Sequence, residues 1–315
     1  MTQEERDLLR RRVERTFGST PVGEAIGPVR AIVGPRMPGG QEAAERARTK
    51  LYNGEEPTPK ERAALEVMIR LLRPALLCRG TVFDDLAANN QYAEDLRTQW
   101  TNFRALIGPL AFSAGRVDAQ DGRALGTAFL VAPNRIMTND HVLDALSYGT
   151  FEIERGQGTV HFQWRWEPAN TEGPVMITRV VAHDAVLDVA LLEIDPPAGF
   201  AHRPFELETA DPVTGDFVAV VGYPMKDRNN RNPAFTDQLF EGKYDVKRAA
   251  PGEIVRTQSP VAFHDCSTLG GNSGSPVLSL RSAKIVGLHR SGEFMYRNEA
   301  VQVSALRQFL DVTDH

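Results

Sequence analysis

The sequence predicts two kinds of structure along the chain: a mainly α-helical N-terminal region over residues 1–104 and an all-β domain over residues 105–315. Two observations carry this fold class. Before about residue 105, apolar side chains recur every three or four positions among many charged ones, which is the pattern of amphipathic helices. After Gly108, short apolar runs alternate with turns rich in Gly, Pro, Asn and Asp, a rhythm typical of a β-sandwich or β-barrel.

In the N-terminal region, helices are expected over residues 4–17, 41–52, 58–73 and 92–107. The third begins with a capping box in which Thr58 is the N-cap, Pro59 the first helical residue and Glu61 the reciprocal partner. Residues 18–40 are rich in Gly and Pro. Such a stretch is expected to let residues 1–55 move independently of the rest.

In the all-β domain, strands are expected over residues 124–131, 135–139, 159–165, 175–183, 189–194, 217–222, 252–257, 275–280 and 284–289. A last strand at 301–303 closes the sheet, and residues 304–313 are expected to form a short terminal helix.

Charge and composition exclude several classes of function. The net charge is −5 and no basic run stands out, so nucleic-acid binding is unsupported. No apolar stretch approaches a membrane span, and the N-terminus lacks the apolar core of a signal peptide. The spacing of Cys and His predicts no metal site, and no cofactor is expected. The two cysteines, Cys78 and Cys266, predict a reducing, cytoplasmic compartment. Burial as free thiols is favoured over a bridge between them.

A glycine-rich turn around Ser273 is the strongest chemical signal in the chain. The run Gly271-Asn272-Ser273-Gly274 lies next to a β-type run that starts at Pro276. Glycines allow backbone N–H groups to converge beside the hydroxyl, and acyl transfer needs such donors for its oxyanion intermediate. The alternative is that Ser273 is an ordinary turn residue.

A serine nucleophile needs a base, which is usually a histidine. His141 has the best setting of the seven histidines, because it ends a predicted strand. Asp188, where a loop enters a buried strand, is the candidate that orients the imidazole. Asp140 is adjacent to His141, and on a strand its side chain would point elsewhere. The other competing carboxylates are Asp144, Asp184 and Asp195.

The order His141, Asp188, Ser273 is the chymotrypsin order and differs from that of subtilisin and of the α/β-hydrolases. The motifs that carry a resemblance lie at 138–141, 188–192, 270–277 and 285–292. With them, residues 105–312 resemble the chymotrypsin-like serine peptidases in their bacterial, disulfide-poor form. The resemblance implies two six-stranded antiparallel barrels, at about 108–196 and 207–303, with the active site in the cleft between them.

The resemblance also implies two-step acyl transfer without a cofactor or metal. His141 takes the proton of Ser273, Asp188 holds the imidazole, and the N–H groups of Gly271 and Ser273 form the oxyanion hole. The backbone of the strand segment Arg290, Ser291 and Gly292 is then expected to pair with that of the substrate.

Specificity is expected to differ from that of trypsin. Where trypsin-like relatives carry an Asp that binds Lys or Arg, this chain has Ser267. Thr268 and His289 stand where a hydroxyl and an imidazole bind a carboxylate in the glutamyl endopeptidases. The resemblance therefore favours acidic or small polar residues before the scissile bond. The alternative for His289 is a packed strand residue.

These observations together predict a serine endopeptidase that acts on protein targets, with a catalytically silent binding or adaptor protein as the alternative. The region before residue 105 contains no histidine and one cysteine, so it offers no second catalytic set. We expect residues 1–55 to regulate or recruit through a protein partner, in a bacterial signalling or defence pathway. Residues 74–107 are expected to brace the first barrel.

Overall fold

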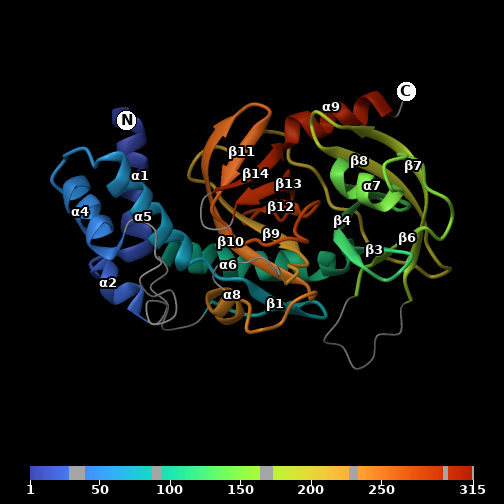
Figure 1. Cartoon of the computed structure of the whole chain (residues 1–315), viewed down its shortest axis with the longest axis horizontal. Helices are drawn as coiled ribbons and strands as arrows, with labels where there is room; N and C mark the ends of the chain where they lie inside the picture. The colour runs from blue at the N-terminus through green and yellow to red at the C-terminus, as the bar shows by residue number, and fades with distance from the viewer. Residues whose placement is uncertain (28–39, 87–93, 164–172, 227–232, 294–296, 314–315) are drawn as a thin grey trace.

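The computed structural model describes residues 1–27, 40–86, 94–163, 173–226, 233–293 and 297–313. Figure 1 shows three bodies in a row: a group of N-terminal helices, a β-barrel in the middle and another β-barrel at the far end. The middle barrel is the later one in the sequence, so the N-terminal helices lie beside it. Within the described ranges, no helix is both long and apolar enough to cross a lipid bilayer.

The N-terminal helices have a core of their own. They are α1 (Gln3–Phe17), α2 (Val22–Ala25), α4 (Gly40–Tyr52) and α5 (Pro59–Leu71). The predicted capping box starts α5, since Thr58 accepts from the backbone of Glu61 and the Glu61 side chain accepts from the backbone of Thr58. Val13 and Met68 are fully buried where the apolar faces meet. Most of the Gly/Pro-rich stretch, at 28–39, lies outside the described residues.

A β-hairpin lies within the region that was predicted to be mainly helical. It consists of β1 (Leu76–Arg79) and β2 (Val82–Phe83), and β1 pairs antiparallel with β10 (Arg248–Gln258). Pro74 stands just before it, which is where a helix must stop, and Leu77 and Phe83 are then buried against the barrel. The N-terminal region therefore adds two strands to the sheet of the second barrel.

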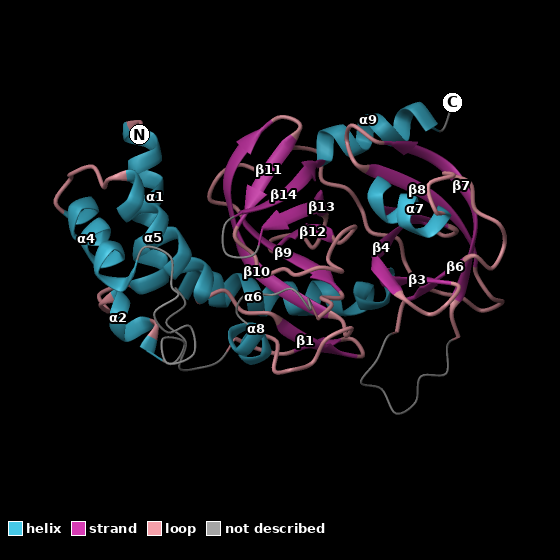
Figure 2. Ribbon diagram, in the orientation of Figure 1, coloured by secondary structure: helices cyan, strands magenta, loops and turns pink. Residues whose placement is uncertain are grey.

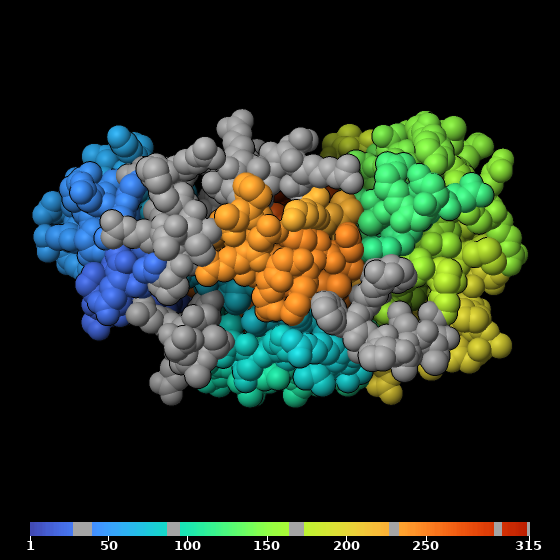
Figure 3. Space-filling model, turned by 60° about the horizontal axis from the view of Figure 1, so that its bottom comes forward, coloured from blue at the N-terminus to red at the C-terminus, as the bar shows by residue number. Residues whose placement is uncertain are grey.

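The helix α6 (Glu94–Ile107) and the 3-10 turn η2 (Gly108–Ser113) lead from the hairpin into the first barrel. Residues 92 and 93 of the predicted helix lie outside the described residues. Trp100 and Phe103 of α6 are fully buried in one core with residues of both barrels. Figure 2 shows α6 running along the second barrel, and in Figure 3 the teal segment that contains it lies against the orange surface of that barrel.

The first barrel closes from six strands in the order β3–β4–β5–β8–β7–β6. They are β3 (Ala114–Ala119), β4 (Ala124–Ala132), β5 (Arg135–Thr138), β6 (Gly158–His161), β7 (Val175–Asp184) and β8 (Val189–Asp195). Leu130, Ile136 and Leu192 fill its interior. The sequence analysis did not predict β3, because Arg116 and Asp118 interrupt its apolar residues; in the folded barrel both are buried and pair with each other. The predicted strand 159–165 ends outside the described residues.

The second barrel is also closed and six-stranded. Its strands are β9 (Phe217–Gly222), β10, β11 (Val261–His264), β12 (Pro276–Ser279), β13 (Ile285–Glu293) and β14 (Arg297–Gln302). They run in the order β11–β14–β13–β12–β9–β10, and a pairing between β10 and β11 closes the ring. The long strand β10 pairs with both β9 and β11, and its register with β11 shifts between Ile254 and Arg256. Two closed barrels after a helical region confirm the predicted fold class.

Two further helices flank this barrel: α8 (Pro233–Leu239) and α9 (Val303–Thr313). The helix α9 follows β14 directly and buries Leu306 in the core that the two barrels share. Both cysteines are buried and free, as expected from the sequence.

Candidate active site

His141 lies in the first turn of a short helix, α7 (Asp140–Ser147), which follows β5. The sequence prediction that it ends a strand is therefore wrong by a few residues. Asn139 takes the extended N-cap conformation, and the next residues turn into a helix that buries Val142 and Leu146 on one face. His141 remains exposed on the other side, with 49% of its side chain accessible, so its ring can reach a substrate.

The carboxylate of Asp188 contacts both the backbone and the side chain of His141. Its carboxylate accepts from the backbone N–H of His141 at 3.0 Å and lies 2.9 Å, at Oδ2, from Nδ1 of the imidazole. The Asn139 side chain in turn donates to the carbonyl oxygen of Asp188 at 2.8 Å. A carboxylate at Nδ1 favours the tautomer with the proton on that atom and leaves Nε2 free as a base.

The backbone of Asp188 is itself unusual, since its φ of 61° lies in the left-handed region that non-glycine residues rarely adopt. A strained residue at a functional position is held there by its surroundings. The bonds to Asn139 and His141 are the contacts that fix it.

Asp140, the nearest competing carboxylate, serves another histidine. Its Oδ1 lies 2.8 Å from Nδ1 of His183, and the His183 ring stacks on Phe151 with a centroid distance of 4.7 Å. Asp140 therefore points away from His141, as predicted, although the cause is the helix geometry of α7 and not that of a strand.

The turn that carries Ser273 is bonded to the first barrel. The Ser273 carbonyl accepts from the N–H of Thr127 at 2.8 Å, and the Thr127 hydroxyl donates to the Gly271 carbonyl at 2.7 Å. Thr138, three residues before His141, donates to the Thr127 carbonyl at 2.7 Å. One chain of hydrogen bonds therefore connects the glycine-rich turn of Ser273 with the strand that leads to His141.

A close packing contact brings the same two segments together at Gly126. A Cβ atom at this position would lie 2.8 Å from Val142, the neighbour of His141, and 2.9 Å from the Ser273 carbonyl oxygen. Only a glycine leaves room for both. The structure thus places Ser273 beside the segment of His141, across the junction of the two barrels.

The N–H groups of Gly271 and Ser273, predicted to form an oxyanion hole, have no protein acceptor among the described residues. Gly271 and Gly274 adopt φ of 87° and 83°. A side chain at Gly271 would collide with the Tyr223 carbonyl, and one at Gly274 with that of Thr127. The glycines are therefore required by both dihedral angle and space, and they leave two donors available for an incoming oxygen.

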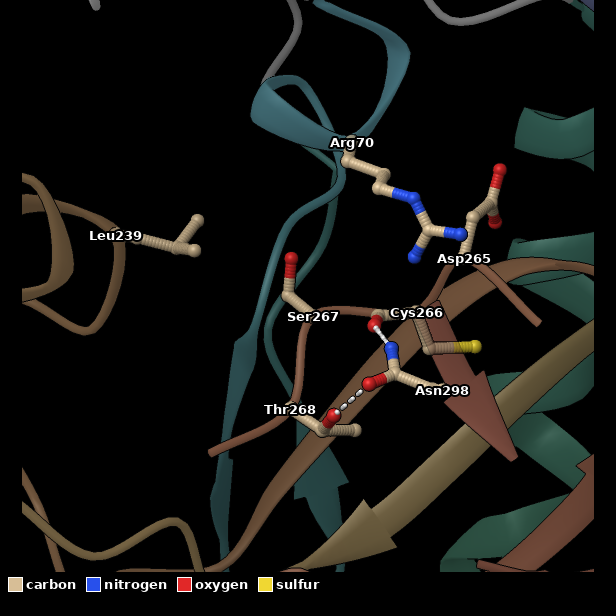
Figure 4. Close-up of a pocket in the computed structure, with 7 residues that line it drawn as sticks. All are labelled: Arg70, Leu239, Asp265, Cys266, Ser267, Thr268 and Asn298. Atoms are coloured by element: carbon tan, nitrogen blue, oxygen red, sulfur yellow. Dashed lines mark hydrogen bonds between the residues drawn. The ribbon is translucent and has the colours of Figure 1, made fainter. Parts of the chain in front are cut away.

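Ser267 and Thr268 lie at the base of the nucleophile turn, buried and already hydrogen-bonded. The Ser267 hydroxyl donates to the Arg73 carbonyl at 2.7 Å, and the Thr268 hydroxyl donates to Asn298 Oδ1 at 2.9 Å. Asn298 also donates to the Cys266 carbonyl at 2.6 Å. Figure 4 shows these residues around one small pocket.

His289 is buried and pairs with a second buried histidine, His264, at 3.1 Å between Nδ1 and Nε2. Burial disfavours the imidazolium and lowers the pKa of His289 to about 3, with a smaller contribution from nearby His141. Burial likewise lowers the pKa of His264 well below its usual value. His289 is therefore a neutral strand residue near His141 and Asp188 in this structure.

The segment Arg290–Gly292 continues β13 past the end of its pairing with β12, which stops at Leu288. On its other side, Ser291 and Gly292 pair with β14, and a register shift at Arg290 marks a bulge. Arg290 forms an ion pair with Glu299 at 2.9 Å. Among the described strands, none pairs with the outer edge of this segment, which is where an extended substrate was predicted to bind.

A buried ionic cluster, which the sequence analysis did not predict, links the N-terminal helices to the segment just before the glycine-rich turn of Ser273. Its fully buried carboxylates are Asp265 and Glu253. Arg12 of α1 and Arg73, just after α5, both pair with Asp265, at 3.0 and 2.8 Å. Arg70 of α5 lies in the same region. These charges are far apart in sequence, so no local pattern could have found them.

The double barrel with a His–Asp pair beside a glycine-rich serine turn defines the trypsin-like class of peptidase folds. The trypsin-like peptidase domain family matches residues 126–288, more than half of the chain, and the chain belongs to this family. It is 25% identical over 196 residues to a glutamyl endopeptidase of Staphylococcus epidermidis, covering 60% of this chain and 62% of that protein. A glutamyl endopeptidase of Staphylococcus aureus is 23% identical over 202 residues, covering 62% of this chain and 55% of that protein.

The chain thus spans less than two thirds of the length of these curated relatives. Among solved structures, a serine endoprotease from Yersinia pestis superposes with a TM-score of 0.48 at 16% identity, over 68% of this chain and 66% of that one. The active form of a protease from Mycobacterium tuberculosis superposes with a TM-score of 0.45 at 20% identity, over 65% of this chain and 82% of that one.

Proposed function

We propose that the protein is a serine endopeptidase with His141, Asp188 and Ser273 as its triad. The observation that carries this is the carboxylate of Asp188 bound to both the backbone N–H and Nδ1 of His141. Nε2 of His141 removes the proton of Ser273 Oγ, which attacks the carbonyl carbon of a peptide bond. The N–H groups of Gly271 and Ser273 stabilise the oxyanion, and water then hydrolyses the acyl-enzyme.

Labelling by a fluorophosphonate probe tests this proposal. The parent protein is expected to react, and Ser273→Ala is expected to lose both labelling and peptide hydrolysis while keeping its circular dichroism spectrum. Ser275→Ala, two residues along the same turn, is the matched control and should still be labelled. Equal labelling of the parent and Ser273→Ala would refute the assignment.

We further propose cleavage after acidic or small polar residues. Two curated relatives carry the name glutamyl endopeptidase, and no acidic residue occupies positions 267 and 268. A neutral pocket wall of Ser267 and Thr268 does not attract Lys or Arg. A peptide-library cleavage profile tests this preference. Efficient cleavage after Lys or Arg, with none after Glu or Asp, would rule it out.

The N-terminal region, residues 1–104, is proposed to be a regulatory and bracing unit for a peptidase domain over residues 105–315. We propose that residues 1–55 regulate the enzyme or recruit a protein partner in a bacterial signalling or defence pathway. The ion pair between Arg12 and Asp265 supports regulation, because Asp265 and Ser267 line the same small pocket. The free thiols of Cys78 and Cys266 support a reducing, cytoplasmic location.

Removal of residues 1–55 tests this role. The truncation removes the core that α1 and α4 share with α5 and the pair of Arg12 with Asp265, so folding of the remainder is checked first by circular dichroism. If the remainder folds and hydrolyses a small ester, a change in its activity on proteins or in its partner binding supports the role. Failure to fold, or unchanged activity and interactions, would count against regulation.

A further inference from the structure

A wide groove lies between the N-terminal helices and the second barrel. It encloses about 760 Å³, which falls within the range of ligand sites, roughly 300–1,000 Å³. The helices α1 and α5 line one side, and Thr214 with residues of β10 and β11 lines the other. Figure 1 shows α1 and α5 on the side of the barrel that carries these two strands. None of His141, Asp188 and Ser273 lines this groove, so it is separate from the candidate active site.

The inner surface of the groove is largely apolar. Leu8 of α1, Val255 of β10 and Phe263 of β11 all line it, and each of them is only half-buried. The guanidinium of Arg256 lies over the Phe263 ring, 4.2 Å from its centroid, so a cation stands beside this apolar surface. A ligand with apolar side chains would remove the three side chains from water, which is favourable.

The charges at the floor of the groove balance one another. Arg12 and Glu66 both line the groove and pair at 2.8 Å. In the cluster that they join, three guanidiniums face three carboxylates, those of Arg12, Arg70 and Arg73 and those of Glu66, Glu253 and Asp265. Arg15 and Asp95, which pair with each other at 3.4 Å, add one charge of each sign beside it. The floor therefore carries no net charge.

The exposed rim of the groove is positive. Its carboxylates are those of Glu4 and Glu5, and its cations are those of Arg11, Lys60, Arg62 and Arg256. Among the described residues, no carboxylate lies within 4.0 Å of any of these four cations. Both glutamates lie in the first turn of α1, where the helix dipole offsets negative charge, and Glu5 also accepts from the Thr2 N–H. The four cations thus exceed the two carboxylates, and the cations have no partners there.

We propose that this groove binds an acidic, amphipathic segment of a partner protein. The apolar side chains of that segment cover Leu8, Val255 and Phe263, and its carboxylates meet the four cations of the rim. A concave groove does not fit a flat lipid bilayer, and the glutamates on its rim repel a phosphate backbone. A peptide segment is therefore the occupant that the observations favour.

The proposal deepens the recruitment role proposed for residues 1–55 and does not depend on catalysis. It extends the binding surface from α1 to α5 and to the second barrel itself. Arg12 at the floor pairs with Asp265 at 3.0 Å, so a bound partner lies one ion pair from the segment that leads to Ser273.

Selection from a phage library of random dodecapeptides tests the proposal. The target is the full-length protein carrying Ser273→Ala, so that a bound peptide is not cleaved. We expect the enriched sequences to combine Asp or Glu with large apolar residues. Enrichment of peptides without acidic residues, or no enrichment at all, would overturn the proposal.

Charge reversal then shows where an enriched peptide binds. Fluorescence polarisation of the fluorescein-labelled peptide gives its Kd. We expect the double variant Arg62→Glu and Arg256→Glu to raise the Kd on the order of tenfold or more. The matched control is Arg123→Glu with Arg281→Glu, two exposed arginines that do not line the groove, and it should leave the Kd nearly unchanged. Equal effects of the two double variants would count against the groove.

The apolar wall is tested in the same assay. Leu8→Gln should also weaken binding, whereas Val312→Gln, exposed on α9, should not. Circular dichroism of each variant shows that it is folded. Retained affinity in Leu8→Gln together with retained affinity in the charge-reversed variant would place the peptide elsewhere.

Other occupants give different results. A parent that sediments as a dimer and becomes monomeric on charge reversal of Arg62 and Arg256 would assign the groove to a second copy of the chain. Binding to phosphatidylserine vesicles that the same variant loses, with no peptide enriched, would assign it to a lipid surface. Either result would overturn the proposal. Failure of the peptidase function is seen separately, as a parent that does not react with a fluorophosphonate, and it leaves these binding measurements valid.

Discussion

Ser267, at the base of the predicted substrate pocket, donates a 2.7 Å hydrogen bond to the backbone carbonyl of Arg73, just past the end of α5. The side chain of the same arginine pairs with Asp265 at 2.8 Å and with Glu253 at 3.1 Å. The N-terminal region and the second barrel therefore share one buried hydrogen-bonded unit. Changes in that unit are expected to affect folding and substrate binding together.

The first prediction concerns Asp265. Its removal in Asp265→Ala leaves Arg12 and Arg73 buried without their shared carboxylate. We expect the free energy of unfolding to fall by about 3–5 kcal/mol, because the two buried guanidiniums then keep only Glu66 and Glu253 as partners. Urea unfolding followed by circular dichroism measures this. Glu206→Ala, which breaks the exposed ion pair with Lys284, should cause no measurable loss. A loss at Asp265 as small as that of the control would contradict the prediction.

The second prediction concerns the tautomer of His141. In Asp188→Asn the amide no longer favours a proton on Nδ1, so Nε2 is no longer held as the free base. We expect kcat to fall on the order of 10⁴-fold with little change in stability. Steady-state kinetics on a peptide ester gives the comparison. Asp140→Asn alters the pair with His183 and should reduce kcat far less. A comparable loss in both variants would argue that Asp188 has no special role.

The third prediction concerns the oxyanion hole. In Gly271→Ala the new methyl group meets the Tyr223 carbonyl at a φ of 87°, so the peptide must shift and its N–H must move. We expect kcat to fall on the order of 10²–10³-fold, which is the effect of losing one such donor. Gly270→Ala is the matched control, because a Cβ there meets nothing within 4 Å. Retained activity in Gly271→Ala would place the oxyanion donors elsewhere.

The sequence predicted those features that depend on local pattern or on chain order. The α5 capping box followed from Thr58 and Glu61, and the candidate triad followed from the order of its members. The helix α7 was missed because one turn at Asn139 decides between strand and helix. The strand β3 was missed because it contains Arg116 and Asp118, two charged residues that are buried and pair with each other in the folded barrel.

Contacts between segments far apart in the sequence could not be predicted from local patterns. The pocket joins Arg70 to residues near position 267, and the pairing of Arg12 with Asp265 spans an even longer separation. Charged residues on a predicted amphipathic helix are normally assigned to solvent. Only the folded arrangement shows that Arg12, Arg70 and Arg73 are buried.

The fourth prediction concerns pH and the two buried histidines. Burial lowers the pKa of His289 to about 3 and that of His264 well below its usual value, whereas both titrate near 6.5 in the unfolded chain. Between these values the unfolded state binds more protons, so the free energy of unfolding is highest above about pH 6.5 and falls as the pH drops toward 3. Each buried imidazole contributes a slope of roughly 1 kcal/mol per pH unit.

The useful window is pH 4.5–6.5, because Asp265, whose pKa is lowered by its arginine partners, contributes only below about pH 4. Urea unfolding at several pH values should show the slope in the parent. His289→Gln removes one titrating group from both states and should reduce the slope by roughly 1 kcal/mol per pH unit. An unchanged slope would mean that His289 is protonated in the folded protein, and its neutral pairing with His264 would then be wrong.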